Sequence, residues 1–163
     1  MYACGFNEFG ELGIPMVDDE TSTGNAAVTY KCRKTPVAID FQPKVRFIAA
    51  GKNHSAAVTM TSADGESDTK LYTWGLSSHG QLGHEKVKNS YNISRPKKVK
   101  FLEEPNTRIV FISAAERHNL CLDTHGNIWF FGEKQSVGVR EFEDIYQFSP
   151  RKLQSDRGKN LSS

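Results

Sequence analysis

The sequence has only three cysteines, no apolar run long enough to span a membrane, and no helical periodicity over any useful length. Cys4, Cys32 and Cys121 have neither the paired spacing of a zinc site nor that of a redox motif. We expect Cys4 and Cys121, which lie in predicted strands, to be buried reduced thiols. No secretory signal is visible, so the sequence predicts a cytoplasmic or nuclear protein that does not bind a membrane.

An excess of one charge is also lacking. The 163 residues include 21 Lys and Arg against 19 Asp and Glu, a net charge of +2. A charge this small does not by itself indicate a nucleic-acid-binding protein. The length is that of one average domain. Glycine is frequent, with 13 residues, and many of them recur in a repeated pattern.

Three kinds of segment are repeated along the chain. An aromatic strand that ends at a glycine and a turn occurs at 1–13 and 71–83, and more loosely at 128–138. Two apolar strands around a small-residue turn, with a His opening the second strand, occur at 47–58 and 111–122. An alternating run with a Pro near its start occurs at 35–39, 95–99 and 149–153. Self-similarity at long, unequal spacing is typical of a repeat architecture with variable surface loops.

These segments predict four-stranded antiparallel units. Such sheets repeated around an axis form a β-propeller, so the predicted fold class is all-β. Because Pro cannot donate to a sheet ladder, each Pro run is assigned to an outermost strand and is taken to open its unit. The predicted organisation is the last strand of a preceding blade plus a long loop at 1–34, a full blade at 35–75, a connecting loop at 76–94, a full blade at 95–132, the start of a further blade at 133–153, and a disordered basic tail at 154–163.

Two stretches carry a resemblance to a known family. The Ala-Gly-x-x-His-Ser stretch at 50–55 and the Trp-Gly-x-x-x-x-Gly-Gln-Leu-Gly stretch at 74–83 resemble the repeats of the regulator of chromosome condensation family. The resemblance covers two full repeats plus two partial ones, from residue 1 to about 153, and is weakest in the third copy. It implies that the four-stranded units are blades of a β-propeller, which in this family is a closed ring of seven blades. The repeat positions are Gly5, Gly10, Gly13, Gly51, His54, Trp74, Gly75, Gly80, Gly83, His118 and Gly132.

Because the chain starts inside a repeat and holds only part of such a ring, we expect a fragment, a shortened product or one piece of an assembly. Terminal repeats without caps expose sheet faces and unpaired strands. We therefore also expect self-association, or stability that depends on a partner or further blades.

The histidines and glycines of the pattern are predicted to be structural. His54 and His118 recur at matching positions, which favours a packing role over metal binding or catalysis. Gly51 is predicted to adopt a positive φ in its turn. Gly75 and Gly80 open no helix and precede no Gly-Lys-Ser/Thr motif, so no nucleotide cofactor is predicted. No catalytic residue and no metal ligand is assigned, and the adjacent side chains of Ser77, Ser78 and His79 are not expected to form a catalytic pair.

A basic cluster is the candidate binding site. It comprises Lys86, Lys88, Arg95, Lys97, Lys98 and Lys100. Because strand side chains alternate, Lys98 and Lys100 share one face, and Arg95 and Lys97 share the other. The cluster fits a phosphate-rich or acidic partner, but the favoured interpretation is an outer strand that lysines protect against edge pairing.

The predicted function is a non-catalytic scaffold that binds another protein, whose identity the sequence does not give. The resemblance also implies a guanine-nucleotide exchange factor for a small Ran-like GTPase, or a chromatin or nucleic-acid contact through the basic cluster. The exchange-factor subgroup is marked by Gly-x-Asn-Asp, and by Arg and Thr after its Leu-Gly. This chain has Gly5-Phe6-Asn7-Glu8, and Ile14-Pro15 after Leu12-Gly13. These departures favour the scaffold.

Overall fold

The computed structural model describes residues 1–14, 32–63, 66–85, 92–101, 104, 106–138 and 144–153. These residues form strands and a single 3-10 turn, η1 (Gln135–Val137), which confirms the all-β prediction. No described helix has the length and hydropathy needed to cross a bilayer. The strands are β1 (Tyr2–Phe6), β2 (Cys32–Ala38), β3 (Val45–Ala50), β4 (His54–Ala63), β5 (Glu66–Leu76), β6 (Asn92–Lys98), β7 (Ile109–Ala114), β8 (His118–Asp123), β9 (Ile128–Glu133) and β10 (Tyr146–Lys152).

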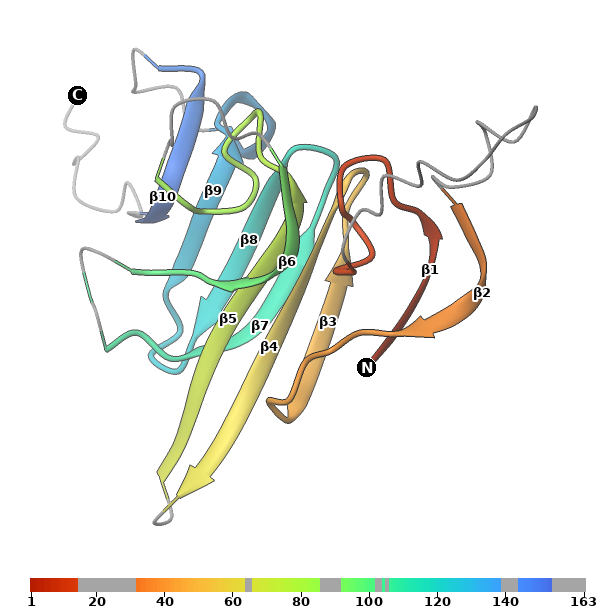
Figure 1. Cartoon of the computed structure of the whole chain (residues 1–163). Coiled ribbons are helices and arrows are strands. Elements are labelled where there is room, and N and C mark those ends of the chain that lie inside the picture. The colour runs from red at the N-terminus through yellow and green to blue at the C-terminus, as the bar shows by residue number, and fades with distance from the viewer. Residues whose placement is uncertain are drawn as a thin grey trace, which may run out of the picture.

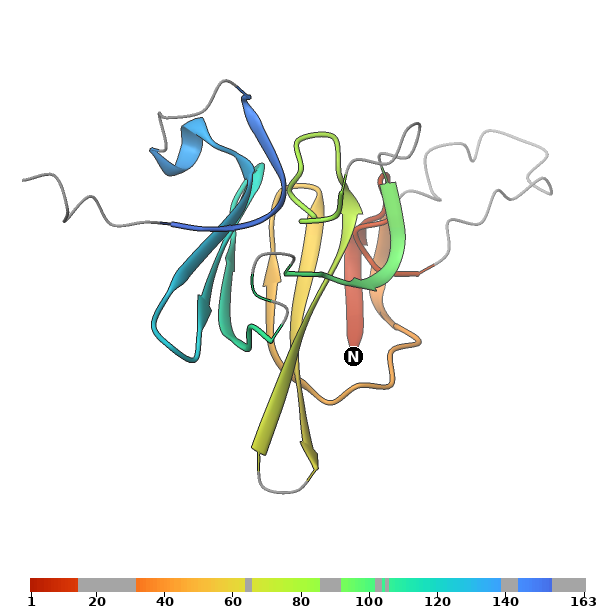
Figure 2. The same cartoon turned by 90° about the vertical axis from the view of Figure 1, so that its left-hand side faces the viewer.

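Three antiparallel sheets stand side by side (Figures 1 and 2). The first sheet pairs β1 with β2, the second has the order β3-β4-β5-β6, and the third has the order β10-β9-β8-β7. The second and third sheets are equivalent, because His54 pairs with Gly75 in one and His118 pairs with Gly132 in the other. Trp74 and Phe131 occupy matching positions beside these pairs. The prediction of four-stranded antiparallel sheets is therefore confirmed.

The predicted grouping of strands into units was wrong by one strand. Each Pro-bearing strand closes the sheet of the strand before it, and none opens the next sheet. Thus β2 pairs with β1, β6 pairs with β5, and β10 pairs with β9. The full sheets accordingly run from Val45 to Lys98 and from Ile109 to Lys152, in place of 35–75 and 95–132. The segment 133–153 completes a sheet through β10 and does not start one.

A repeated bulge accommodates the Pro of each of these edge strands. Between the pairs Thr73↔Lys97 and Gly75↔Ile93, β6 places three residues opposite Trp74 alone, and Pro96 is the last of the three. Pro36 and Pro150 hold the same place in β2 and β10. A Pro lacks the donor that a ladder needs, so it is accommodated at an edge or a bulge. The Pro therefore identifies an edge strand in the sequence, but it does not show which neighbouring strand that edge strand joins.

Two apolar cores lie between neighbouring sheets. The larger core packs Val58 and Leu71 of the second sheet against Ile112, Trp129 and other side chains of the third sheet. The smaller core packs Ala57 and Trp74 against the first sheet. Because side chains alternate along β4 and β5, the second sheet supplies both cores from its two faces.

The outer faces of the first and third sheets carry exposed apolar side chains. Tyr2 and Phe6 of β1 are 71% and 72% exposed. Leu122 and Ile128 form an exposed cross-strand pair on the third sheet, next to Phe111, whose half-exposed ring also contacts Phe47 of β3 edge-on at 5.8 Å. Cys4, which was predicted to be buried, is exposed on β1, whereas Cys121 is buried in the larger core. The prediction for Cys4 failed because strand alternation turns it to the face opposite Ala3.

Candidate interaction surface

A tight turn of the first sheet packs onto the second sheet, and the equivalent turn of the second sheet packs onto the third. The carbonyl oxygen of Glu11 accepts hydrogen bonds from Trp74 Nε1 and Ser55 Oγ, both at 2.8 Å. The equivalent carbonyl of Gln81 accepts a hydrogen bond from Asn119 Nδ2 at 2.6 Å. These turn-to-sheet contacts satisfy buried polar groups at matching places, as close packing of successive sheets requires.

The glycines of these turns lie where a side chain has no room. A Cβ on Gly13 would lie 2.9 Å from Trp74 Nε1, and a Cβ on Gly83 would lie 3.0 Å from the Phe131 ring. Gly10 and Gly80 meet the backbones of β6 and β10 in the same way. The strand-end glycines and all four turn glycines have positive φ, a conformation that favours glycine: Gly5, Gly10, Gly13, Gly75, Gly80, Gly83 and Gly132.

Gly51 differs from what the sequence predicted, since it is not among the glycines with positive φ. Its constraint is contact: a Cβ there would overlap the His54 ring and the carbonyl oxygen of Ala115. The turn between β3 and β4 therefore lies directly against the third sheet. Sequence could not separate this cause from backbone strain, because both select glycine.

His54 is buried between the second and third sheets, with 1% of its surface exposed. Its Nε2 lies 3.2 Å from Asn119 Oδ1, and its Nδ1 has no partner among the described residues. Burial lowers its pKa to about 4, partly opposed by the hydrogen bond to Asn119. His118 is half-buried, and burial lowers its pKa as well. Both imidazoles thus favour the neutral form.

Ser78 and His79 form a hydrogen bond, with 2.8 Å between Ser78 Oγ and His79 Nδ1. The His79 ring stacks edge-on against Tyr146 at 5.1 Å, and burial together with Arg117 lowers its pKa. No hydrogen bond joins His79 to a carboxylate of the described residues. A nucleophilic triad needs such an acid to orient the base. Nor do three potential metal-binding side chains gather anywhere in the described ranges.

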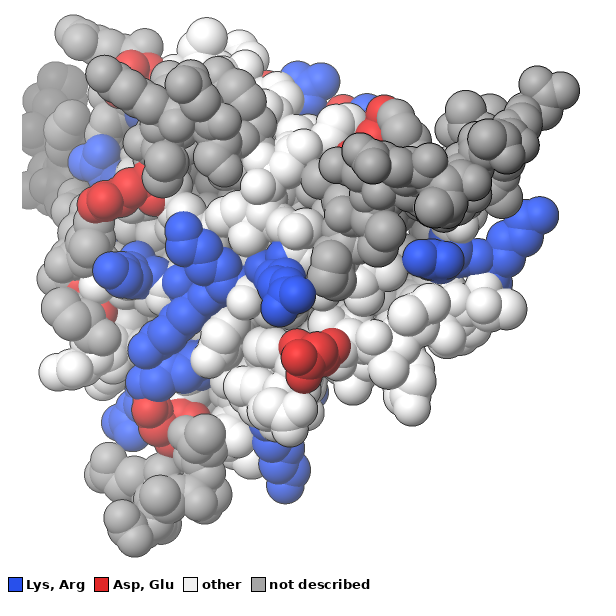
Figure 3. Space-filling view, in the orientation of Figure 1, with Lys and Arg blue, Asp and Glu red and all other residues white. Residues whose placement is uncertain are grey.

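The basic cluster lies mainly on the edge strand β6. Arg95, Lys97, Lys98 and Lys100 are all exposed, and none forms an ion pair with a described residue. Figure 3 shows Lys and Arg side chains gathered over β5 and β6. Lys86 and Lys88, which the sequence also assigned to this cluster, lie outside the described residues. The described cations therefore form a surface along one open edge of the second sheet.

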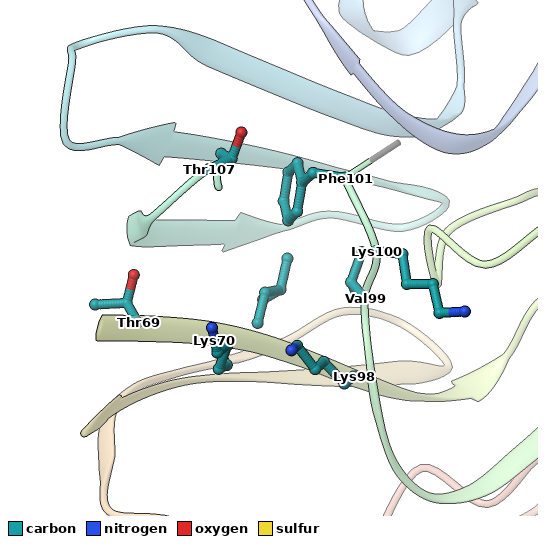
Figure 4. Close-up of a pocket in the computed structure, with 8 residues that line it drawn as sticks. Thr69, Lys70, Lys98, Val99, Lys100, Phe101 and Thr107 are labelled. Carbon is teal, nitrogen blue, oxygen red and sulfur yellow. The ribbon is translucent and has the colours of Figure 1, made fainter. Parts of the chain in front are cut away.

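A hollow of about 230 Å³ opens beside this edge, between the second and third sheets. Figure 4 shows Phe101 and Thr107 on the side of the third sheet, and Lys70 and Lys98 on the side of β5 and β6. The lining residues are Thr69, Lys70, Leu71, Lys98, Val99, Lys100, Phe101 and Thr107. Sequence reasoning found Lys98 and Lys100 but missed Lys70, which is distant in the chain and is brought near only by the pairing of Tyr72 with Lys98.

Comparison with known proteins identifies the repeats. The family model for the regulator of chromosome condensation (RCC1) repeat matches residues 1–58 and 68–122. The guanine nucleotide exchange factor SRM1 of Saccharomyces cerevisiae is 35% identical over 89 residues, 54% of this chain and 17% of that protein. The ultraviolet-B receptor UVR8 of Arabidopsis thaliana is 27% identical over 166 residues, 99% of this chain and 32% of the receptor.

Among solved structures, Prp20p from Saccharomyces cerevisiae superposes with a TM-score of 0.65 at 24% identity, covering 93% of this chain and 34% of Prp20p. That likeness shows the fold. The chain spans about one third or less of the length of each of these relatives. The family model matches most of the chain, and the equivalent sheets with their repeated turn contacts fit the same repeat. The chain therefore belongs to the regulator of chromosome condensation (RCC1) repeat family of β-propeller proteins.

Proposed function

We propose that this chain is a non-catalytic scaffold whose propeller blades bind another protein, in the cytoplasm or the nucleus. The observation that carries the proposal is the exposed edge strand β6, where Arg95, Lys97, Lys98 and Lys100 have no ion pair with a described residue. His54 and the turn glycines, in contrast, are occupied in contacts between sheets. Exposed groups on an edge of a rigid scaffold are well placed for binding.

The test is affinity capture after cross-linking, in cells of the source organism. We expect the unmodified chain to retain a defined set of proteins. Charge reversal of Arg95, Lys97, Lys98 and Lys100 to Glu should remove them. Reversal of Arg33 and Lys34, which are exposed on β2 of the first sheet, is the control and should not. Equal capture by both variants would contradict a binding role for this edge.

Nucleotide exchange on a Ran-type GTPase is the second candidate. It is favoured by the likeness to SRM1, which is named as an exchange factor, and to Prp20p, whose structure is described with its binding to Gsp1p and histones. We expect this chain not to accelerate release of a fluorescent guanine nucleotide from such a GTPase. Faster nucleotide release at a stoichiometric concentration of this chain would contradict the scaffold proposal and support an exchange factor. Tight DNA binding with a steep salt dependence would favour the chromatin contact instead.

A further inference from the structure

In two of the three Pro-bearing edge strands, a residue with a hydroxyl group comes directly before the Pro. On β2 the paired residues nearest to Thr35 are Arg33 and Val37, so Thr35 lies in the bulge and is not among the paired residues. Ser149 holds the same place on β10, and Arg95 holds it on β6. The chain contains no other Ser-Pro or Thr-Pro dipeptide.

Thr35 is accessible in the folded chain. Thr35 and Pro36 are both exposed, as are Arg33 and Lys34 before them. β2 is one edge of its sheet and lies at the opposite end of the molecule from β10 (Figures 1 and 2). The residue before a Pro is largely confined to extended conformations. An enzyme can therefore bind this hydroxyl in an extended segment without first breaking ladder pairs at Thr35.

Ser149 occupies the equivalent bulge but is much less accessible. Its side chain is partly buried, and Pro150 is buried. Gln147 Nε2 donates hydrogen bonds to the carbonyl oxygen of Ser149 at 2.9 Å and to Ser149 Oγ at 3.3 Å. The turn of the second sheet also lies against this strand, because a Cβ on Gly80 would be 2.5 Å from the Gln147 carbonyl oxygen.

The turns between sheets account for this difference. The turn of the first sheet packs on β6, where a Cβ on Gly10 would lie 2.6 Å from Ser94 Cα. The turn of the second sheet packs on β10 in the same way. No glycine turn of the described residues packs on β2. The bulge at Thr35 and Pro36 is therefore uncovered, whereas the equivalent bulges are in contact with a neighbouring turn.

Two cations precede the exposed hydroxyl. Arg33 and Lys34 are exposed, and neither forms an ion pair with a described residue. A phosphoryl group on a Thr hydroxyl carries about −1.5 to −2 charges at neutral pH. Its addition to Thr35 would cancel most of the positive charge of this strand.

We propose that Thr35 is a phosphorylation site for a proline-directed protein kinase. Thr35 Oγ1 attacks the γ-phosphorus of Mg-ATP, the bond to the bridging oxygen of the β-phosphate breaks, and ADP leaves. The hydroxyl proton passes to the catalytic Asp of the kinase. Pro36 selects this kinase class, because Pro has no N–H that would need an acceptor in the kinase site. The assignment goes beyond the scaffold function and does not depend on it.

The test is phosphorylation of the folded full chain by a purified proline-directed kinase with Mg-ATP, followed by intact mass spectrometry and peptide mapping. We expect one phosphate per chain, located on Thr35. The Thr35→Ala variant should lose it, and the Thr35→Ser variant, which keeps a hydroxyl, should retain it. Ser149→Ala is the matched control and should still accept one phosphate. Pro36→Ala should lose the phosphate although Thr35 is unchanged.

Phosphate on Ser149 of the folded chain, with or without phosphate on Thr35, would overturn the proposal. So would an unmodified Thr35 in a reaction where the same kinase phosphorylates a standard Ser-Pro peptide. Equal incorporation at Thr35 in the Pro36→Ala variant would overturn the assignment to a proline-directed kinase. Mapping the site on the unmodified chain keeps the result independent of how well the Thr35→Ala variant folds.

Discussion

At the scale of single residues, the turn glycines and His54 act through close contacts between sheets. Gly13 and Gly83 leave room for an aromatic ring of the next sheet, and His54 lies against Asn119 across the same kind of boundary. These positions share a motif but differ in what constrains them. Gly51 is constrained by its neighbours alone, which makes its substitution informative.

Gly51→Ala should lower the free energy of unfolding by more than about 1 kcal/mol, because the added methyl group overlaps His54 and the Ala115 carbonyl oxygen. Gly126→Ala is the matched control: its Cβ would meet nothing within 4 Å, and it bears only the cost of a φ of +80°. Urea denaturation of the two variants measures both effects. A smaller loss at Gly51 than at Gly126 would mean that the β3–β4 turn does not press on the third sheet.

Stability should fall as the pH is lowered from about 6.5 to 4. Burial lowers the pKa of His54 to about 4, so in this range the unfolded chain binds a proton there that the folded chain does not. The free energy of unfolding therefore decreases with falling pH, by at most about 3 kcal/mol from this residue. Burial and then Lys97 lower the pKa of His84 to about 4 as well, and His84 acts in the same direction.

The measurement is the urea midpoint between pH 7 and pH 4. The His54→Gln variant should show a shallower pH dependence than the unmodified chain, whatever its stability at pH 7. The His125→Gln variant, changed at an exposed turn residue, is the control. An unchanged slope in His54→Gln would show that this imidazole is not kept neutral by burial.

At the scale of elements, the turn that follows each glycine strand joins that sheet to the next. Trp74 and Ser55 both donate to the carbonyl oxygen of Glu11, so either can satisfy it alone. Trp74→Phe, which copies the aromatic residue at Phe131, should cost about 1 kcal/mol, and Ser55→Ala a similar amount. The double variant should cost more than the sum, because the carbonyl then has no protein donor.

A double-mutant cycle from urea denaturation gives the coupling between these two donors. We expect a coupling of about 1 kcal/mol. Strictly additive losses would indicate that water replaces the missing donors and that the turn is not sealed against the second sheet.

Sequence predicted the existence of most strands because the repeats align, but it did not predict how they group. The Pro runs at 35–39, 95–99 and 149–153 are edge strands as expected, yet each joins the preceding glycine strand. The hollow beside β5 was also beyond sequence reasoning. It depends on the pairing register that brings Lys70 of β5 toward Lys98 of β6. That register is not visible in the local sequence pattern.

At the scale of the whole molecule, the described sheets form a stack with two apolar outer faces. Tyr2 and Phe6 project from the first sheet, and Leu122 and Ile128 from the third, where they are 38% and 45% exposed. The equivalent faces inside the stack are covered by a neighbouring sheet. Exposed apolar rows of this kind promote association.

The apolar outer faces of the stack are surfaces for binding, and light scattering after size exclusion at low micromolar concentration tests this most directly. We expect a molar mass above that of one chain, which rises with concentration and returns toward one chain in a Leu122→Lys/Ile128→Lys variant. A sharp monomer at every concentration, with a cooperative and concentration-independent melt, would contradict it and would show that the three sheets need nothing on their outer faces.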